Sequence, residues 1–189
     1  MIFVGPHEHH SNLLPWRESG CEVVTVPERS DDGSVDLGEL DRLLRLPEYS
    51  PSSGRLRAGA FSAASNVTGI IADVDSISAL LHRHGALAFF DYASCAPYAK
   101  MDMNPPPSPA GEDGDDTSKD AMYFSPHKLY GGTSSPGVLV IKKRVSFWCG
   151  CLSVPPPSSR RSPDLGACFS SFVSNYCPEP RCRLDAVHP

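Results

Sequence analysis

One lysine, Lys128, stands in a sequence context that can support covalent chemistry. It closely follows the apolar residues 121–124, which are typical of a short buried strand, and it precedes a flexible glycine pair at 131–132. A lysine amine can form a Schiff base with a carbonyl compound, and the neighbouring Ser125 and His127 can hydrogen-bond an anion. This combination indicates pyridoxal phosphate as a cofactor, although an exposed lysine is more often only a solvated charge.

Pyridoxal phosphate requires two further groups, which can be sought upstream of the lysine. A carboxylate must keep the pyridine nitrogen protonated, and a flat group must stack on the ring. Asp91 follows the apolar residues 86–90, so it is predicted to lie at the carboxyl tip of a parallel strand, where open α/β sheets place their sites. His10 is the candidate for stacking, and Asn66 supplies a polar amide after another apolar segment.

Taken together, these segments resemble the class V aminotransferase family, best known through the cysteine desulfurases, which have the fold type I pyridoxal-phosphate architecture. The resemblance covers about residues 1–144. In that family, a His-His-small-Asn-x-x-Pro-Trp segment supplies the ring-stacking histidine, which matches His10. A Ser-Asn-Val-x-Gly segment supplies an asparagine near the ring oxygen, which matches Asn66, and the aspartate at the pyridine nitrogen matches Asp91.

The Ser-x-His-Lys segment of the family matches Ser125, His127 and Lys128, with the first two on the phosphate and the lysine as the attachment point. The resemblance implies that Lys128, Asp91 and His10 are catalytic. The implied cofactor-binding residues are His10, Asn66, Asp91, Ser94, Ser125, His127 and Lys128.

The chain also departs from the family pattern. Desulfurases have Asp-Gly-Ala-Gln where this chain has Asp-Tyr-Ala-Ser, so Ser94 replaces a glutamine that reaches the phenolic oxygen of the cofactor. The Gly/Thr-rich turn that grips the phosphate is expected before Met1. The C-terminal small domain, with its substrate-binding arginine and sulfur-accepting cysteine, has no counterpart. We therefore expect a partial large domain, truncated at both ends.

Alternating elements must position these residues. Cys21–Val26 is β-branched and typical of a strand, and leucines at helical spacing predict a helix over 36–46. Further elements are predicted as a helix starting near Ser11 or Asn12 with Pro15 in its first turn, strands over 56–64, 86–90, 121–124 and 137–142, and a helix over 74–84 between Asp73 and Gly85. This order predicts an α/β fold with a mainly parallel sheet and flanking helices.

Two segments do not fit this pattern. Residues 104–120 are rich in proline and acidic residues and are predicted to form a mobile surface loop inserted into the large domain. Residues 145–189 are rich in serine, proline and cysteine without periodicity. We interpret them as a disordered or foreign tail, which leaves residues 1–144 as the partial cofactor-binding domain.

The composition excludes several classes of partner. The formal net charge of −5 gives no basic surface for nucleic acid or an anionic membrane, and no apolar run has membrane-spanning length. No secretory signal is visible, so an intracellular, cytoplasmic protein is expected. Without a secretory context the seven cysteines are not expected to form structural disulfides, and neither they nor His7, His9 and His10 have metal-ligand spacing.

Two functions of different classes follow from these observations. The first is a pyridoxal-phosphate-dependent enzyme that acts on an amino acid or another amino compound by transamination, desulfuration or elimination. Family resemblance implies that such an enzyme is a homodimer. The alternative is a catalytically incompetent fragment that retains the sheet and serves in dimerisation or partner binding.

Overall fold

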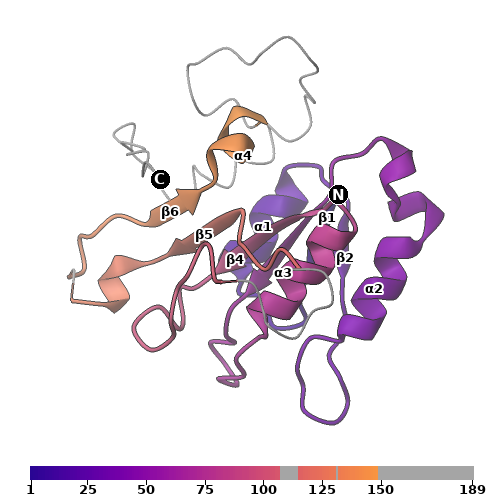
Figure 1. The fold of residues 1–189 in the computed structure, drawn as a ribbon. Coiled ribbons are helices and arrows are strands. Elements are labelled where there is room, and N and C mark those ends of the chain that lie inside the picture. The colour runs from indigo at the N-terminus through magenta and orange to yellow at the C-terminus, as the bar shows by residue number, and fades with distance from the viewer. Residues whose placement is uncertain (107–114, 131, 149–189) are drawn as a thin grey trace.

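The computed structural model describes residues 1–106, 115–130 and 132–148. Its six strands form one sheet in the order β2-β1-β3-β4-β5-β6 (Figure 1). The strands are β1 (Ile2–Val4), β2 (Val23–Thr25), β3 (Ala58–Ser62), β4 (Leu87–Asp91), β5 (Ala121–Phe124) and β6 (Val138–Ile141). The first five run parallel, and β6 pairs with β5 in the antiparallel direction. The predicted α/β fold with a mainly parallel sheet is therefore confirmed.

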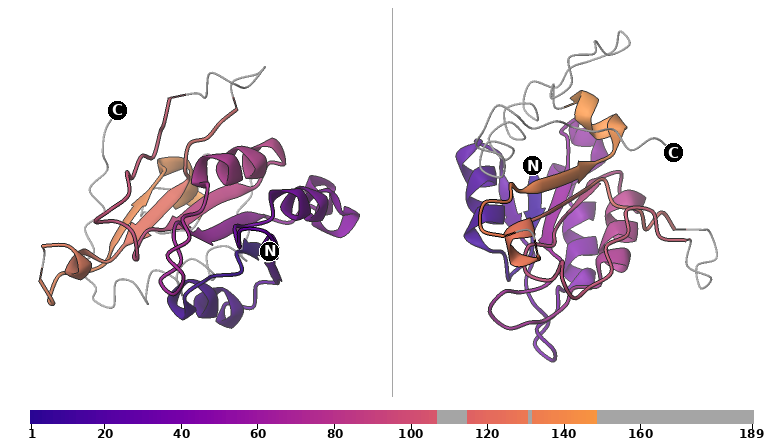
Figure 2. Two further views of the ribbon diagram at one scale, coloured as in Figure 1. Left: turned by 90° about the horizontal axis from the view of Figure 1, so that it is seen from below. Right: turned by 90° about the vertical axis from the view of Figure 1, so that its left-hand side faces the viewer.

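Helices cover both faces of the sheet. They are α1 (His10–Glu18), α2 (Leu37–Arg45), α3 (Val74–Arg83) and α4 (Lys143–Trp148), with short 3-10 turns η1 (Pro47–Tyr49), η2 (Pro51–Ser53) and η3 (Pro126–Lys128). Figure 2 shows α1 on one side of the sheet and α2 and α3 on the other. None of the helices in the described part of the chain is long and apolar enough to cross a membrane.

Each face of the sheet has its own apolar core, because successive strand residues point to opposite faces. Phe3 of β1 packs in one core with leucines of α2 and α3, such as Leu44 and Leu81. Its neighbours in the strand, Ile2 and Val4, pack in the other core with Trp16 of α1. A strand that is buried on both faces is apolar throughout, which is typical of parallel sheets with helices on both sides.

Helix α3 begins and ends at the predicted capping residues. Asp73 is the N-cap, and its Oδ1 accepts a hydrogen bond from the Ser76 N–H at 3.1 Å. Gly85 follows the helix with φ +66°, a conformation that glycine adopts without steric cost. The predicted start of α1 is wrong. Its N-cap is His9, whose ring accepts from the Ser11 N–H, and Pro15 lies in the middle of the helix instead of its first turn.

The structure also corrects the two segments that were predicted to be unstructured. Thr117, Lys119 and Asp120 are buried, so the described part of the 104–120 segment after residue 114 is packed against the domain and is not a mobile surface loop. Residues 107–114 lie outside the described residues. Val145 lies in α4 and is buried, so the predicted tail boundary is placed too early. The remainder of that tail, 149–189, is outside the described residues.

The expectation that structural disulfides are absent concerns mainly cysteines that lie outside the described residues; Cys21 and Cys95 are the two cysteines within them. Cys95 is free and buried. Within the described ranges, no group of three or more histidine, cysteine, aspartate or glutamate side chains is arranged to hold a metal ion.

Candidate functional site

A cleft of about 380 Å³ opens at the carboxyl ends of the parallel strands. Its walls come from the segments after β1, β3, β4 and β5 and from the residue before β6. They are formed by His9, Ser11, Ser62, Ala64, Asn66, Asp91, Ala93, Ser94, Ser125, His127, Lys128 and Gly137. Because β2 and β3 lie on opposite sides of β1, the chain changes direction across the sheet beside this cleft. Open α/β sheets form their ligand crevices at such a switch point.

Asp91 is the last residue of β4 and forms part of the buried wall of the cleft. Only 4% of its surface is exposed. Its Oδ1 accepts a hydrogen bond from the Ala93 N–H at 2.8 Å, and its backbone carbonyl accepts from the Ala63 N–H at 2.8 Å. The strand pairing and the turn after it therefore fix both the backbone and the carboxyl group of Asp91.

Lys128 ends the η3 turn, which is separated from the end of β5 by Ser125 alone. Its backbone N–H donates to the carbonyl of Ser125 at 3.0 Å, and Ser125 is the N-cap residue of the turn. This compact turn brings Ser125, His127 and Lys128 to the cleft together, while the side chain of Lys128 stays accessible. Gly132, with φ +77°, then turns the chain back toward β6.

Asn66 and Ser94 occupy neighbouring positions on the wall formed by the segments after β3 and β4. Asn66 is exposed at the start of a turn in which Ser65 Oγ accepts from the backbone N–H groups of Val67 and Thr68, at 3.2 Å and 3.1 Å. The hydroxyl of Ser94 donates to the carbonyl of Ala64 at 2.6 Å. Ser94 therefore joins the two loops, and its proton is directed at the protein.

The two adjacent histidines at the start of α1 have different positions. Both are exposed, but His9 lines the cleft, whereas the predicted stacking residue His10 is not among the lining residues. Because Nδ1 of His9 accepts from the Ser11 N–H at 3.2 Å, a neutral His9 ring carries its proton on Nε2. Of these two adjacent histidines, His9 is the one that lines the cleft, where a bound ring would lie.

Sequence reasoning missed three residues that bring polar side chains to the cleft, namely His9, Ser11 and Ser62. The sequence does not show that His9 is the N-cap of α1, nor which of the two adjacent histidines faces the cleft. Ser62 ends β3, where a polar residue after a run of small and apolar ones marks the end of a buried strand. No sequence signal sets Ser11 apart from other serines of helix N-termini.

The set of groups in the cleft fits pyridoxal phosphate chemically. A buried carboxylate, Asp91, forms one wall, and a primary amine, Lys128, forms another. Ser125 and His127 add a hydroxyl and an imidazole beside the lysine, and His9 adds a flat ring. These are the kinds of group that the ring nitrogen, the aldehyde carbon, the phosphate and the ring face require.

Known proteins resemble the chain in both sequence and structure. The family model for aminotransferase class-V matches residues 1–147. A probable cysteine desulfurase of Halalkalibacterium halodurans is 31% identical over 146 residues, which are 75% of this chain and 31% of that protein. A probable cysteine desulfurase of Chlamydia muridarum is 30% identical over 192 residues, covering 100% of this chain and 41% of that protein.

A solved structure, the cysteine desulfurase CsdA from Escherichia coli, superposes with a TM-score of 0.60 at 29% identity, over 77% of this chain and 32% of that one. The chain therefore spans less than half the length of these relatives. The matching family model covers nearly all of the described residues, including every residue that lines the cleft. The chain belongs to the class V aminotransferase family.

Proposed function

We propose that this chain forms the cofactor-binding part of a pyridoxal-phosphate-dependent enzyme that acts on an amino acid or another amino compound. The observation that carries the proposal is the convergence of Lys128, Asp91, Asn66, Ser125 and His127 in one cleft, although the segments that supply them lie far apart in the sequence. The relatives named as cysteine desulfurases support this function over a non-enzymatic remnant.

When bound, pyridoxal phosphate acts as an electron sink for negative charge on the carbon that bears the substrate's amino group. Lys128 supplies the amine that attaches the cofactor and that moves a proton at this carbon. Asp91 accepts a hydrogen bond from the protonated ring nitrogen and keeps the proton there. His9 holds the ring plane, and Ser125 and His127 bind the phosphate.

Asn66 and Ser94 differ in whether they can donate a hydrogen bond to the cofactor. The amide of Asn66 can donate to the phenolic oxygen of the cofactor. The proton of the Ser94 hydroxyl is already donated to Ala64, so this side chain can only accept a hydrogen bond from a ligand. The contact that the family makes with a glutamine at this position is therefore not reproduced by Ser94, and Asn66 becomes the donor at that oxygen.

Binding of the cofactor is the direct test of this function. Pyridoxal phosphate is titrated into the purified protein while the visible absorption of the bound form is followed, and the sample is then reduced with borohydride. We expect a saturable signal that becomes irreversible after reduction. Absence of saturable binding at pyridoxal phosphate concentrations up to about 1 mM, on the order of the weakest specific sites, would refute the proposal.

The proposal includes a second copy of the chain, because the family resemblance implies a homodimer. The measurement is the molar mass in solution by light scattering, with and without pyridoxal phosphate. A mass of two chains supports this part of the proposal. A monomer under both conditions contradicts it, without affecting the assignment of the cofactor residues.

A further inference from the structure

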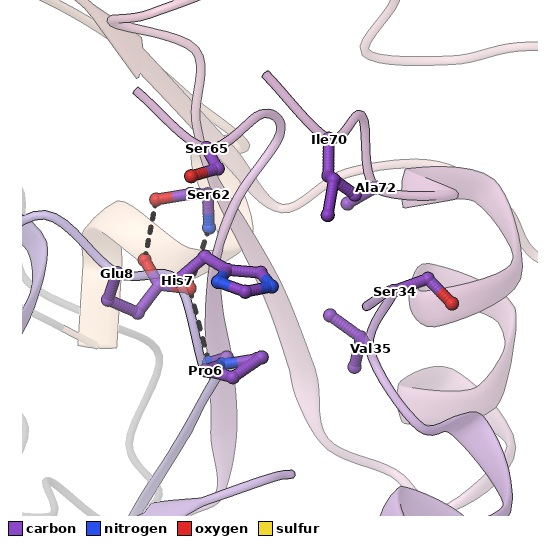
Figure 3. Close-up of a pocket in the computed structure, with 10 residues that line it drawn as sticks. Pro6, His7, Glu8, Ser34, Val35, Ser62, Ser65, Ile70 and Ala72 are labelled. Carbon is purple, nitrogen blue, oxygen red and sulfur yellow. Dashed lines mark hydrogen bonds between the residues drawn. The ribbon is translucent and has the colours of Figure 1, made fainter. Parts of the chain in front are cut away.

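A half-buried glutamate, Glu8, lies immediately before His9, and its carboxyl group is surrounded by hydrogen-bond donors. Its Oε1 accepts from the backbone N–H groups of Gly5 and Ser62, at 3.1 Å and 2.8 Å. Its Oε2 accepts from the Ser62 hydroxyl at 2.7 Å and from the side-chain amide of Asn12 at 2.5 Å. Figure 3 shows the Glu8 side chain pointing toward Ser62 at the end of β3. Four donors thus hold one side chain of the segment that leads into α1.

The network continues through Asn12, which has no exposed surface. Oδ1 of Asn12 accepts from the hydroxyl of Tyr123 at 2.5 Å, and Nδ2 also lies 3.4 Å from the carbonyl of Ala60. Tyr123 belongs to β5 and is buried, and Ala60 belongs to β3. The start of α1 is therefore fastened to two strands of the sheet.

This network borders the cofactor cleft. Glu8 lines a small neighbouring pocket with His7 and Ile70 and is not among the residues that line the cleft, whereas Ser62 lines both. Burial raises the pKa of Glu8, and the nearby charge of Asp91 raises it further, while the hydrogen bonds from Ser62 and Asn12 lower it. Because all four hydrogen-bond partners of the Glu8 carboxyl group are donors, the arrangement is satisfied by an acceptor-only carboxylate.

Glu8 and His9 are adjacent, so the conformation that fixes one also fixes the other. His9 is exposed to solvent, and its ring is held by Ser11, a residue of the same short segment. Contacts within one segment cannot set its position over the cleft. The bonds from Glu8 to Ser62 and from Asn12 to Tyr123 run to other elements and can do so.

We propose that Glu8 is a positioning residue that holds His9 over the cofactor cleft by fastening the start of α1 to β3. The position of His9 is a property of the free protein, and its effect on the cofactor rests on the proposed function. Removal of the side chain takes away all four acceptor contacts at once. Glutamine retains a carbonyl oxygen for the backbone N–H groups and restores part of the connection.

The first measurement is hydrogen–deuterium exchange in the cofactor-free protein, with Glu8→Ala, Glu8→Gln and the control Glu18→Ala. Glu18 lies at the other end of α1 and is exposed. We expect exchange of residues 9–13 to accelerate about tenfold in Glu8→Ala and less in Glu8→Gln, while α3 and the control stay unchanged. If Glu8→Ala does not fold, the exchange rates in Glu8→Gln test the proposal, which then requires faster exchange at residues 9–13 and unchanged exchange in α3. Unchanged exchange at 9–13, or an equal rise in α3, overturns the proposal.

The second measurement is a double-mutant cycle on the dissociation constant for pyridoxal phosphate, with Glu8→Gln, His9→Ala and the double variant. If Glu8 acts through His9, the double variant binds no more weakly than His9→Ala alone. Additive losses show that Glu8 acts by another route and overturn the proposal. Failure of the wild-type protein to bind pyridoxal phosphate refutes the proposed function, and the exchange measurement still decides whether Glu8 fastens the His9 segment.

Discussion

The Ala93 N–H donates a hydrogen bond to Oδ1 of Asp91 at 2.8 Å, so the turn after β4 holds the carboxyl group that faces the cleft. An amide oxygen can accept the same bond. Asparagine at this position therefore keeps the local geometry and removes only the negative charge. The substitution Asp91→Asn therefore separates the electrostatic contribution of the Asp91 side chain from its structural contribution.

We predict that Asp91→Asn still binds pyridoxal phosphate but leaves the ring nitrogen unprotonated, because a neutral amide does not stabilise the pyridinium charge. The measurement is the ¹⁵N chemical shift of labelled cofactor in the complex. Exchange of the α-hydrogen of a bound amino acid with solvent should fall by about a hundredfold or more. Asp31→Asn, on the exposed surface, is the control. A protonated ring nitrogen in Asp91→Asn would mean that Asp91 only caps its strand.

We predict that Ser94→Ala destabilises the fold by about 1 kcal/mol, because the carbonyl of Ala64 loses its 2.6 Å hydrogen bond. The dissociation constant for pyridoxal phosphate should change by less than about threefold, while Asn66→Ala should raise it about tenfold. Urea unfolding and cofactor titration measure the two quantities. A larger loss of affinity in Ser94→Ala than in Asn66→Ala would show that Ser94 is the principal donor to the cofactor.

Arg57 is buried at the opposite end of the sheet, where it connects two chain segments. Its Nη1 donates to the carbonyl of Tyr49 at 2.9 Å, and its Nη2 donates to the carbonyl of His84. We predict that Arg57→Met lowers the free energy of unfolding by about 2 kcal/mol or more, since both carbonyls lose their charged donor. The control is Arg55→Met, whose side chain is 45% exposed beside Glu22. Equal losses in both variants would contradict the assigned role.

The contribution of His82 to the stability of the protein should fall as the pH rises, because this side chain is hydrogen-bonded to the buried Asp120. Burial lowers the pKa of His82, but its hydrogen bond to Asp120 and its contacts with Asp116 outweigh this, so that the net shift is upward from 6.5. A raised folded-state pKa contributes stability that is fully present below the ordinary value. That contribution is lost as the pH rises through the folded-state pKa.

The test compares unfolding free energies at about pH 5.5 and about pH 8.5, on either side of the ordinary histidine range. At the lower pH, we expect the unfolding free energy of the wild-type protein to exceed that of the variant His82→Asn by about 1–3 kcal/mol. At the higher pH, this difference between the two proteins should be smaller. His10→Asn, at an exposed histidine, is the control. A difference between wild type and His82→Asn that is independent of pH would contradict the assignment.

Local sequence patterns predicted the structure well where the type of a single residue determines where a helix or strand ends. Asp73 lies at the start of α3 and Gly85 follows its end, because N-capping and a left-handed backbone conformation both depend on residue type. The position of Asp91 at a strand tip follows from the apolar run before it. The family resemblance then identified residues that the structure brings to the same cleft.

Other features depend on tertiary contacts that a sequence pattern does not contain. Which of His9 and His10 faces the cleft depends on how the start of α1 is held against the sheet, and there Glu8 is hydrogen-bonded to Ser62 at the end of β3. The segment after residue 114 looks like an exposed acidic loop, yet Lys119 and Asp120 are buried there. Partners from α3, namely Asp75 and His82, compensate the charges of these two residues.

The attachment of the cofactor to Lys128 is the central claim, and peptide mapping after borohydride reduction tests it most directly. The protein is incubated with pyridoxal phosphate, reduced, digested and analysed by mass spectrometry, alongside Lys128→Ala and the control Lys100→Ala, whose lysine side chain is 80% exposed. We predict one stoichiometric adduct, on Lys128, which is absent from Lys128→Ala and retained in Lys100→Ala. A stoichiometric adduct on Lys100, Lys119, Lys142 or Lys143, or an undiminished adduct in Lys128→Ala, would contradict the account.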